Sequence, residues 1–359
     1  MAGTNTPVPR KIEEDKEVAV TVNLQENFSR MSSDDFEYLL NEIGPKVGKR
    51  DTNMRKAIPV KEHLAVTLRF FATGDSFTSL GYLIKISHQF ISCILPDICQ
   101  AFIELPQSED EWKQIANGFF QRWNFPHCVG AIGGKHILLQ SPFNSESTSS
   151  SIILLTLVDA DYCFTFIDVG AQGRMNDAGV FACITLYHKM LMRELSFPPD
   201  ESLPGRQLSV PCFYSSSILK PYAGNHAKGT IERIFNYRLC QAQRIVENVF
   251  GILAYVFCVL KSPMLLQPKK AARVCMICAL LHNYLWRSTS SRHIYTPNGV
   301  FDYEADGHFK QLTWRQDTSN SSLAPLTSPI KSLSIYLSIL RYPENHPRRQ
   351  KIFYNQQSS

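Results

Sequence analysis

The chain has 359 residues, of which 44% are hydrophobic and 19% are charged, and its formal net charge is +5. This length suits about two globular domains with ordinary apolar cores. The mildly basic balance permits binding to nucleic acid and fits an ordinary enzyme surface equally well. No segment approaches the roughly 18 consecutive apolar residues that a membrane helix needs, so we expect no membrane partner.

The N-terminal stretch lacks the apolar run that directs secretion, so we expect a protein of the nucleus and cytoplasm. The ten cysteines are scattered through apolar segments, which indicates reduced and buried thiols. Residues 1–26 are polar without a period, and we expect them to be disordered.

A helical region is predicted over residues 27–110. Its first helix is expected to begin at an N-cap within 32–35 and to stop at Gly44-Pro45. A second helix is predicted from Val60 to Phe71, closed by a glycine at position 74.

Two shorter helices are predicted next, over 77–84 and 88–95, with the spacing of a helix-turn-helix. A recognition helix presents amide or basic groups to phosphates and base edges. His88, Gln89 and Ser92 are the candidates for DNA contacts. An ordinary small helical bundle is the alternative reading.

From residue 129 the pattern changes to strands. Two apolar pieces, Val129–Ile132 and His136–Gln140, are separated by a glycine pair at 133–134. Two more strands are predicted over Ser151–Val158 and Cys163–Val169, joined by a hairpin turn at 159–162.

Helices and one further strand follow. Apolar residues recur every three or four positions over 237–260, and 271–286 is apolar nearly all round, so both are expected to be buried helices. A helix is also predicted from Asp177 to Met192 and a fourth strand over 208–214. The fold class over residues 111–290 is therefore α/β, a mixed sheet covered by helices, with an irregular or disordered tail at 291–359.

Carboxylates in this region are candidate ligands of a hard divalent cation such as Mg²⁺. We expect Asp168 and the loop leading to Asp177 to lie at the same sheet edge as Gly133, and the hairpin acids at the far edge. Glu247 lies on the flank of its helix. Two cations bound there would activate water for phosphodiester cleavage. In the alternative, Asp177 is a helix cap and Glu247 a surface residue paired with Arg244.

A second metal pattern is Cys275-x-x-Cys278 with His282. It lacks another ligand pair and lies on a buried helix, which favours core packing over a zinc site.

Several segments resemble the PIF/Harbinger transposase-derived nucleases, a family of DDE endonucleases. The motif FNYRLCQAQRIVENVFGIL at 235–253 is the most specific, and the likeness extends over about 28–326. The resemblance implies an RNase H-like nuclease domain with an Asp-Asp-Glu triad that binds Mg²⁺ or Mn²⁺, preceded by an all-helical helix-turn-helix-like domain. It also implies DNA as a partner and, in many members, a Myb-like partner protein.

When the family's motifs are compared with this chain residue by residue, the resemblance implies that two of the three catalytic acids are missing. Where the family reads GAIDGKH, with its first catalytic acid, this chain has Gly133. The stretch that matches the second acid, 211–219, contains no acid. Glu247 matches the third acid, and Asp177 matches another characteristic acid in the motif NDAGVF.

Three interpretations remain open from the sequence. The chain is a transposase-derived protein with a crippled nuclease that still binds DNA or a protein, or a working endonuclease that uses Asp168, Asp177 and Glu247 as a rearranged set. The third is a decaying transposon copy. The missing acids and shortened segments favour the first and third interpretations, and predict weak metal binding.

Overall fold

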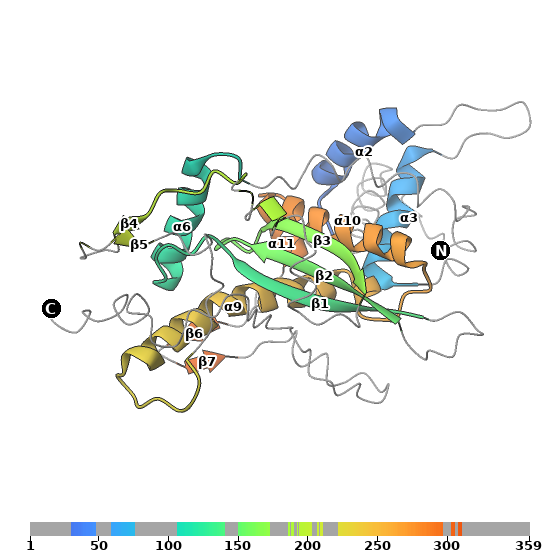
Figure 1. Ribbon diagram of the computed structural model, residues 1–359. Coiled ribbons are helices and arrows are strands. Elements are labelled where there is room, and N and C mark those ends of the chain that lie inside the picture. Colours follow the sequence, from blue (N-terminus) through green and yellow to red (C-terminus); the bar gives the residue numbers. More distant parts are fainter. Residues whose placement is uncertain are drawn as a thin grey trace, which may run out of the picture.

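Figure 1 shows a computed structural model of the chain, which describes residues 30–47, 59–75, 106–140, 150–172 and 222–296, with short stretches within 186–210 and 303–310. The two predicted helices of the helix-turn-helix lie outside the described residues. The helix predicted from Asp177 does so for the most part, although Leu186, His188 and Lys189 are helical. No helix in the described ranges is long and apolar enough to cross a membrane.

A three-stranded antiparallel sheet lies at the centre, in the order β1-β2-β3. Its strands are Ala131–Leu139, Ser150–Val158 and Phe164–Gln172, and the predicted hairpin turn joins the last two. β1 runs unbroken through Gly133 and Gly134, which corrects the expectation of two separate pieces. Glycine weakens a strand, but pairing with β2 along the whole of β1 outweighs that cost.

The register of the strands decides which side chains share a face of the sheet. Directly opposed residues in antiparallel strands point to the same side. Gly133, Thr156 and Ile167 are opposed in turn, so they lie on one face. Helices α9 (Ile231–Val256) and α10 (Pro268–Arg287) cover this side, which we call the helix-covered face.

The two covering helices were both predicted and are confirmed. α9 packs chiefly on β1 and α10 on β3, and both also contact β2. The apolar stripe of α9 is buried as its 3.6-residue period requires. A short 3-10 helix, η1 (Cys258–Leu260), follows α9. The buried residues of α9 include Phe235, Leu239, Ala242, Val246, Val249, Phe250 and Leu253.

The N-terminal helices α2 (Ser33–Val47) and α3 (Val60–Thr73) pack beside α10 and η1 (Figure 1). Their apolar side chains belong to the same core cluster as those of α9 and α10. The described part of the predicted helical region therefore shares the core of the sheet region. α3 ends as predicted at Gly74, whose φ of 69° suits a residue without a side chain.

One prediction about α2 is wrong, because the helix continues through Gly44 and Pro45 instead of stopping there. A proline in the last turn of a helix costs only one backbone hydrogen bond of that turn. The apolar contacts of α2 compensate: Phe36, Leu39 and Ile43 are each at most 3% exposed.

A carboxylate fixes the start of α2 to the end of α10. Asp35 Oδ1 accepts a hydrogen bond from the Tyr284 hydroxyl at 2.8 Å. Its Oδ2 accepts from Ser288 at 2.5 Å and Ser290 at 2.9 Å, and also from Ser291. We call this group the Asp35 clasp. It joins residues about 250 positions apart in the chain.

Helix α6 (Glu109–Trp123) was not predicted, although its start carries a recognisable signal. The Ser108 side chain accepts a hydrogen bond from the Glu111 N–H, and the Glu111 carboxylate accepts one from the Gln107 N–H. A serine followed three residues later by glutamate is the sequence pattern of such a cap.

The predicted fourth strand is only partly present among the described residues. β5 (Ser209–Val210) pairs with β4 (Glu201–Ser202) in a sheet of their own. The remaining described elements are α11 (Arg292–Tyr295) and a pair of short strands, β6 and β7, over 303–305 and 308–310.

The outer edge of β1 is paired near its end. The Met264 N–H donates to the Leu138 carbonyl at 2.9 Å, and the Gln140 N–H donates to the Met264 carbonyl at 3.0 Å. Backbone groups of a strand alternate in direction, so those of Ile132 and Gly134 point to the same side. Within the described ranges no strand pairs with that part of the edge.

Candidate active site

Gly133 lies on β1 directly beneath α9. A Cβ atom at this position would lie 2.7 and 2.9 Å from the two γ-methyl groups of Val246, and 3.4 Å from the Phe250 ring. Carbon atoms pack at about 3.5–4.0 Å, so the space next to Gly133 is already filled. Val246 is 4% exposed and is held in the core. Sequence reasoning identified Gly133 but missed Val246, the neighbour that occupies its side-chain space.

Glu247 is the next residue of α9 and is half-buried on the flank of the helix. Burial raises the pKa of the Cys240 thiol, while Arg244 lowers it and Glu247 raises it. The Glu247 carboxylate is therefore close enough to this stretch of α9 to act on it electrostatically. The neighbourhood matches the alternative interpretation of Glu247 as a surface residue near Arg244, and it leaves a ligand role as a prediction.

Asp168 lies on the other face of the sheet. Asp168 of β3 lies opposite Leu155 of β2, and Leu155 lies opposite Gly134 of β1; these three residues form one cross-strand row. Gly133 belongs to the adjacent row, with Thr156 and Ile167. Side chains of adjacent rows point to opposite sides, so Asp168 points away from α9. Burial raises the pKa of the Asp168 carboxyl. Asp168 and position 133 therefore do not share a site on the helix-covered face.

The expected arrangement along the strands is also wrong. Gly133 is the third residue of β1, and Ala131 is level with Val158, the last residue before the hairpin turn. Gly133 therefore lies near the hairpin end of the sheet and not at the opposite edge. The sequence indicated the antiparallel order correctly, but the start of β1 could not be placed from an apolar pattern interrupted by glycines.

Lys135 is a second residue of β1 with an informative position. It shares the helix-covered face with Gly133, since both are odd-numbered in β1. Burial lowers the pKa of its amine to about 8; the nearby Cys275 thiol opposes this and Lys261 adds to it. Ala131, Ile137 and Leu139 alternate with the same period as Lys135, which was the signal available in the sequence.

The other predicted site residues are Asp177 and the three candidates for DNA contacts, His88, Gln89 and Ser92. All four lie outside the described residues. Their roles stay predictions.

Comparison with known proteins relates the central region to one family. Residues 140–283 match the family described as DDE superfamily endonuclease. This region is therefore similar to DDE endonucleases. The match includes β2, β3, α9 and most of α10, and it begins seven residues after Gly133.

The chain is also 20% identical over 286 residues to an Arabidopsis thaliana protein named Antagonist of Like Heterochromatin Protein 1. The alignment covers 72% of each chain. No solved structure matches this chain. The resemblance drawn from the sequence motifs is thus confirmed at the level of the DDE family.

A DDE-family endonuclease generally uses divalent cations held by converging carboxylates. In the part of the chain that the structure describes, no group of three or more His, Cys, Asp or Glu side chains could hold a metal ion. Asp168 faces away from Glu247's helix, and position 133 offers no side-chain oxygen. The described residues of this region therefore do not fit a two-metal centre.

The second metal pattern, Cys275-x-x-Cys278 with His282, is core packing, as predicted. Cys275, Cys278 and His282 are all 0% exposed. The His282 Nδ1 lies 2.7 Å from the Tyr295 hydroxyl, and its Nε2 lies 2.8 Å from the Tyr162 carbonyl. Burial lowers the pKa of His282 to about 4, although the Tyr162 carbonyl opposes the shift. Both ring nitrogens are engaged, which leaves none for a metal.

Proposed function

We propose that the chain is a transposase-derived, nuclease-like protein whose DDE centre is catalytically impaired. It acts by binding DNA or a protein such as a Myb-like partner, in the nucleus and cytoplasm. Mg²⁺ or Mn²⁺, the cations implied by the family, binds weakly. The family match and the relative support the nuclease-like class.

One observation carries the proposal of impairment. The γ-methyl groups of Val246 lie 2.7 and 2.9 Å from where a side chain at position 133 would begin. An acid lost recently from an intact site would leave a space that water or a cation can enter. Here the space is apolar and closed, so α9 and β1 are packed around the glycine. A ligand cannot be restored by one substitution without moving the helix.

The two other interpretations are less well supported. A rearranged centre requires Asp168 and Glu247 to face one another, but Asp168 points to the side of the sheet opposite α9. A decayed copy would lose its packing, whereas one apolar cluster here connects α2, α3, α9, α10 and the sheet. Such a shared core favours a single cooperative unfolding transition.

The test is nicking of supercoiled plasmid by the purified chain with Mg²⁺ or Mn²⁺. We expect the wild-type chain to nick no faster than a Glu247→Gln variant. Nicking by the wild type that disappears in Glu247→Gln would show that the centre works. DNA binding is measured in parallel with EDTA present, and we expect it to weaken steeply with salt because phosphate contacts release counterions.

Two further variants locate the defect. Gly133→Asp supplies the carboxylate in a filled space, whereas Gly133→Asp combined with Val246→Ala also makes room for it. Val246→Ala alone is the matched control for the loss of packing. Nicking by the double variant only would show that the closed space at Gly133 blocks the reaction. If the double variant is as inactive as Val246→Ala, the missing second acid is limiting.

A further inference from the structure

The Asp35 clasp joins α2 to the loop between α10 and α11. Four hydroxyl groups surround Oδ2 of Asp35, those of Ser32, Ser288, Ser290 and Ser291. Asp35 as a whole is 9% exposed. Burial alone would raise its pKa, but the hydrogen bonds from Ser288, Ser291, Tyr284 and Ser290 outweigh this and lower the pKa to about 2. Asp35 is therefore an anion at neutral pH.

The loop that supplies these hydroxyls is accessible at its tip. Thr289 is exposed, Ser288 and Ser290 are half-buried, and Ser291 is buried. Arg287 precedes Ser290 by three residues and is exposed. The loop is a turn between the end of α10 and the four-residue helix α11, and backbone bonds hold Ser288 and Ser291 at its two ends. A local opening of this turn would bring Ser290 fully to the surface.

We propose that Ser290 is a phosphorylation site for a protein kinase that prefers basic residues before its acceptor, and that the phosphate releases α2 from α10. In the reaction the Ser290 Oγ attacks the γ-phosphorus of ATP. The bond from that phosphorus to the β,γ-bridging oxygen breaks, ADP leaves, and the hydroxyl proton passes to the base of the kinase.

Two changes then act on the clasp together. The Ser290 hydroxyl donates to Asp35 Oδ2 at 2.9 Å, and the phosphate ester has no hydrogen to donate. The phosphate also adds about −1.5 to −2 charges beside a carboxylate. The N-terminus of α2 carries an effective charge of about +0.5. The full negative charge of the Asp35 carboxylate is already larger in magnitude than this. Repulsion therefore outweighs attraction to the start of the helix.

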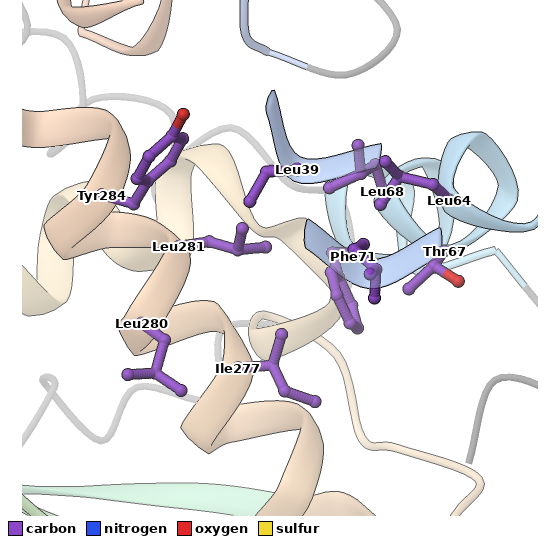
Figure 2. Close-up of a pocket in the computed structure, with 10 residues that line it drawn as sticks. Leu39, Leu64, Thr67, Leu68, Phe71, Ile277, Leu280, Leu281 and Tyr284 are labelled. Atoms are coloured by element: carbon purple, nitrogen blue, oxygen red, sulfur yellow. The ribbon is translucent and has the colours of Figure 1, made fainter. Parts of the chain in front are cut away.

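The release of α2 would uncover an apolar surface. A cavity of about 20 Å³ lies between α2, α3 and α10, and most of the side chains that line it are apolar. Figure 2 shows Leu39 of α2 beside Leu281 and Tyr284 of α10, with Leu68 and Phe71 of α3 completing the wall. A small gap therefore remains between these helices, and the Asp35 clasp is one of the polar contacts that hold α2 against the end of α10.

The experiment uses the full chain and three substitutions. Ser290→Glu places a carboxylate beside Asp35, and Thr289→Glu adds the same charge to the same loop at an exposed position. The double variant Ser290→Glu with Asp35→Asn removes the repelled partner. Thermal unfolding and hydrogen exchange of the α2 amides are measured for each.

We expect Ser290→Glu to lower the melting temperature by about 2–4 °C and to speed exchange in α2 at least tenfold relative to Thr289→Glu. The shift caused by Ser290→Glu should shrink by half or more in the Asp35→Asn background. Equal behaviour of the two glutamate variants, or an undiminished shift in the double variant, would overturn the proposal.

The modification is tested with the catalytic subunit of cyclic-AMP-dependent protein kinase and ATP. Trypsin cuts after Arg287 and Arg292, so one peptide, 288–292, contains every candidate hydroxyl of the loop. Fragmentation of this peptide is expected to place the phosphate on Ser290. A loop that stays unmodified, or a phosphate on Thr289 alone, would refute the site.

Discussion

Replacing Gly133 by alanine tests whether the position that the family resemblance assigns to the first acid is closed. The added Cβ meets both γ-methyl groups of Val246 below 3.0 Å and the Phe250 ring at 3.4 Å. Val246 is β-branched and has one preferred rotamer in a helix, so relief requires a shift of α9 against β1. Overpacking of a well-packed core costs about 1–3 kcal/mol, and we expect the free energy of unfolding to fall by this amount.

Urea unfolding of four chains measures this effect: wild type, Gly133→Ala, Val246→Ala and the double variant. Val246→Ala alone costs on the order of 2 kcal/mol because buried methyl groups are lost. In its background Gly133→Ala should cost much less, which gives a coupling of about 0.5–3 kcal/mol. Gly44→Ala is the matched control, since nothing lies within 4 Å of its added Cβ. It lies within α2 and should stabilise by about 0.5–1 kcal/mol.

The reasoning is refuted if Gly133→Ala is as stable as wild type, or if its cost is the same with and without Val246. Either result would mean that the space beside Gly133 can still accept a side chain.

Two predictions concern pH. Burial raises the pKa of Asp159 from 3.8 to about 6, although the hydrogen bond from the Cys163 backbone opposes the shift. The stability that the protonated Asp159 carboxyl contributes is therefore full below pH 3.8 and is lost as the pH rises through 6. Asp159→Asn should therefore flatten the pH dependence of urea unfolding and raise stability at pH 7 by about 1–3 kcal/mol; a destabilised variant would contradict this. For Asp35 the pH dependence runs the other way, because its pKa is lowered to about 2. The stability that its carboxylate contributes is present above pH 3.8 and is lost as the pH falls toward 2. Asp35→Asn should cost about 1–3 kcal/mol at pH 7 and less at pH 2, and an equal cost at both values would contradict it.

The elements that the sequence predicted well are those in which a single period decides the structure. The stripe of α9 and the alternation of β2 and β3 each place apolar residues on one side, and burial follows from that pattern. The end of α3 was also predictable, because Gly74 adopts the left-handed backbone conformation that commonly closes a helix.

The features that were missed depend on residues distant in the sequence. Nothing near Gly133 indicates that Val246, more than a hundred residues later, fills its side-chain space. The Asp35 clasp likewise needs the spatial meeting of α2 with the end of α10, which no local pattern of serines can show. The inward direction of Lys135 was available from the strand period, but its charge argued for solvent.

Around Ile132 and Gly134 the outer edge of β1 has no partner strand among the described residues, which bears on how the protein behaves at high concentration. An exposed strand edge is a template on which a second molecule can add a strand, and such additions begin aggregates. Lys135 lies on this strand with its amine turned inward beside Cys275 and Lys261. A second copy that paired along the edge would bring its own Lys135 against an already desolvated positive charge. The half-buried lysine, whose desolvation is a cost to the folded chain, thereby discourages growth of the sheet from one molecule to the next.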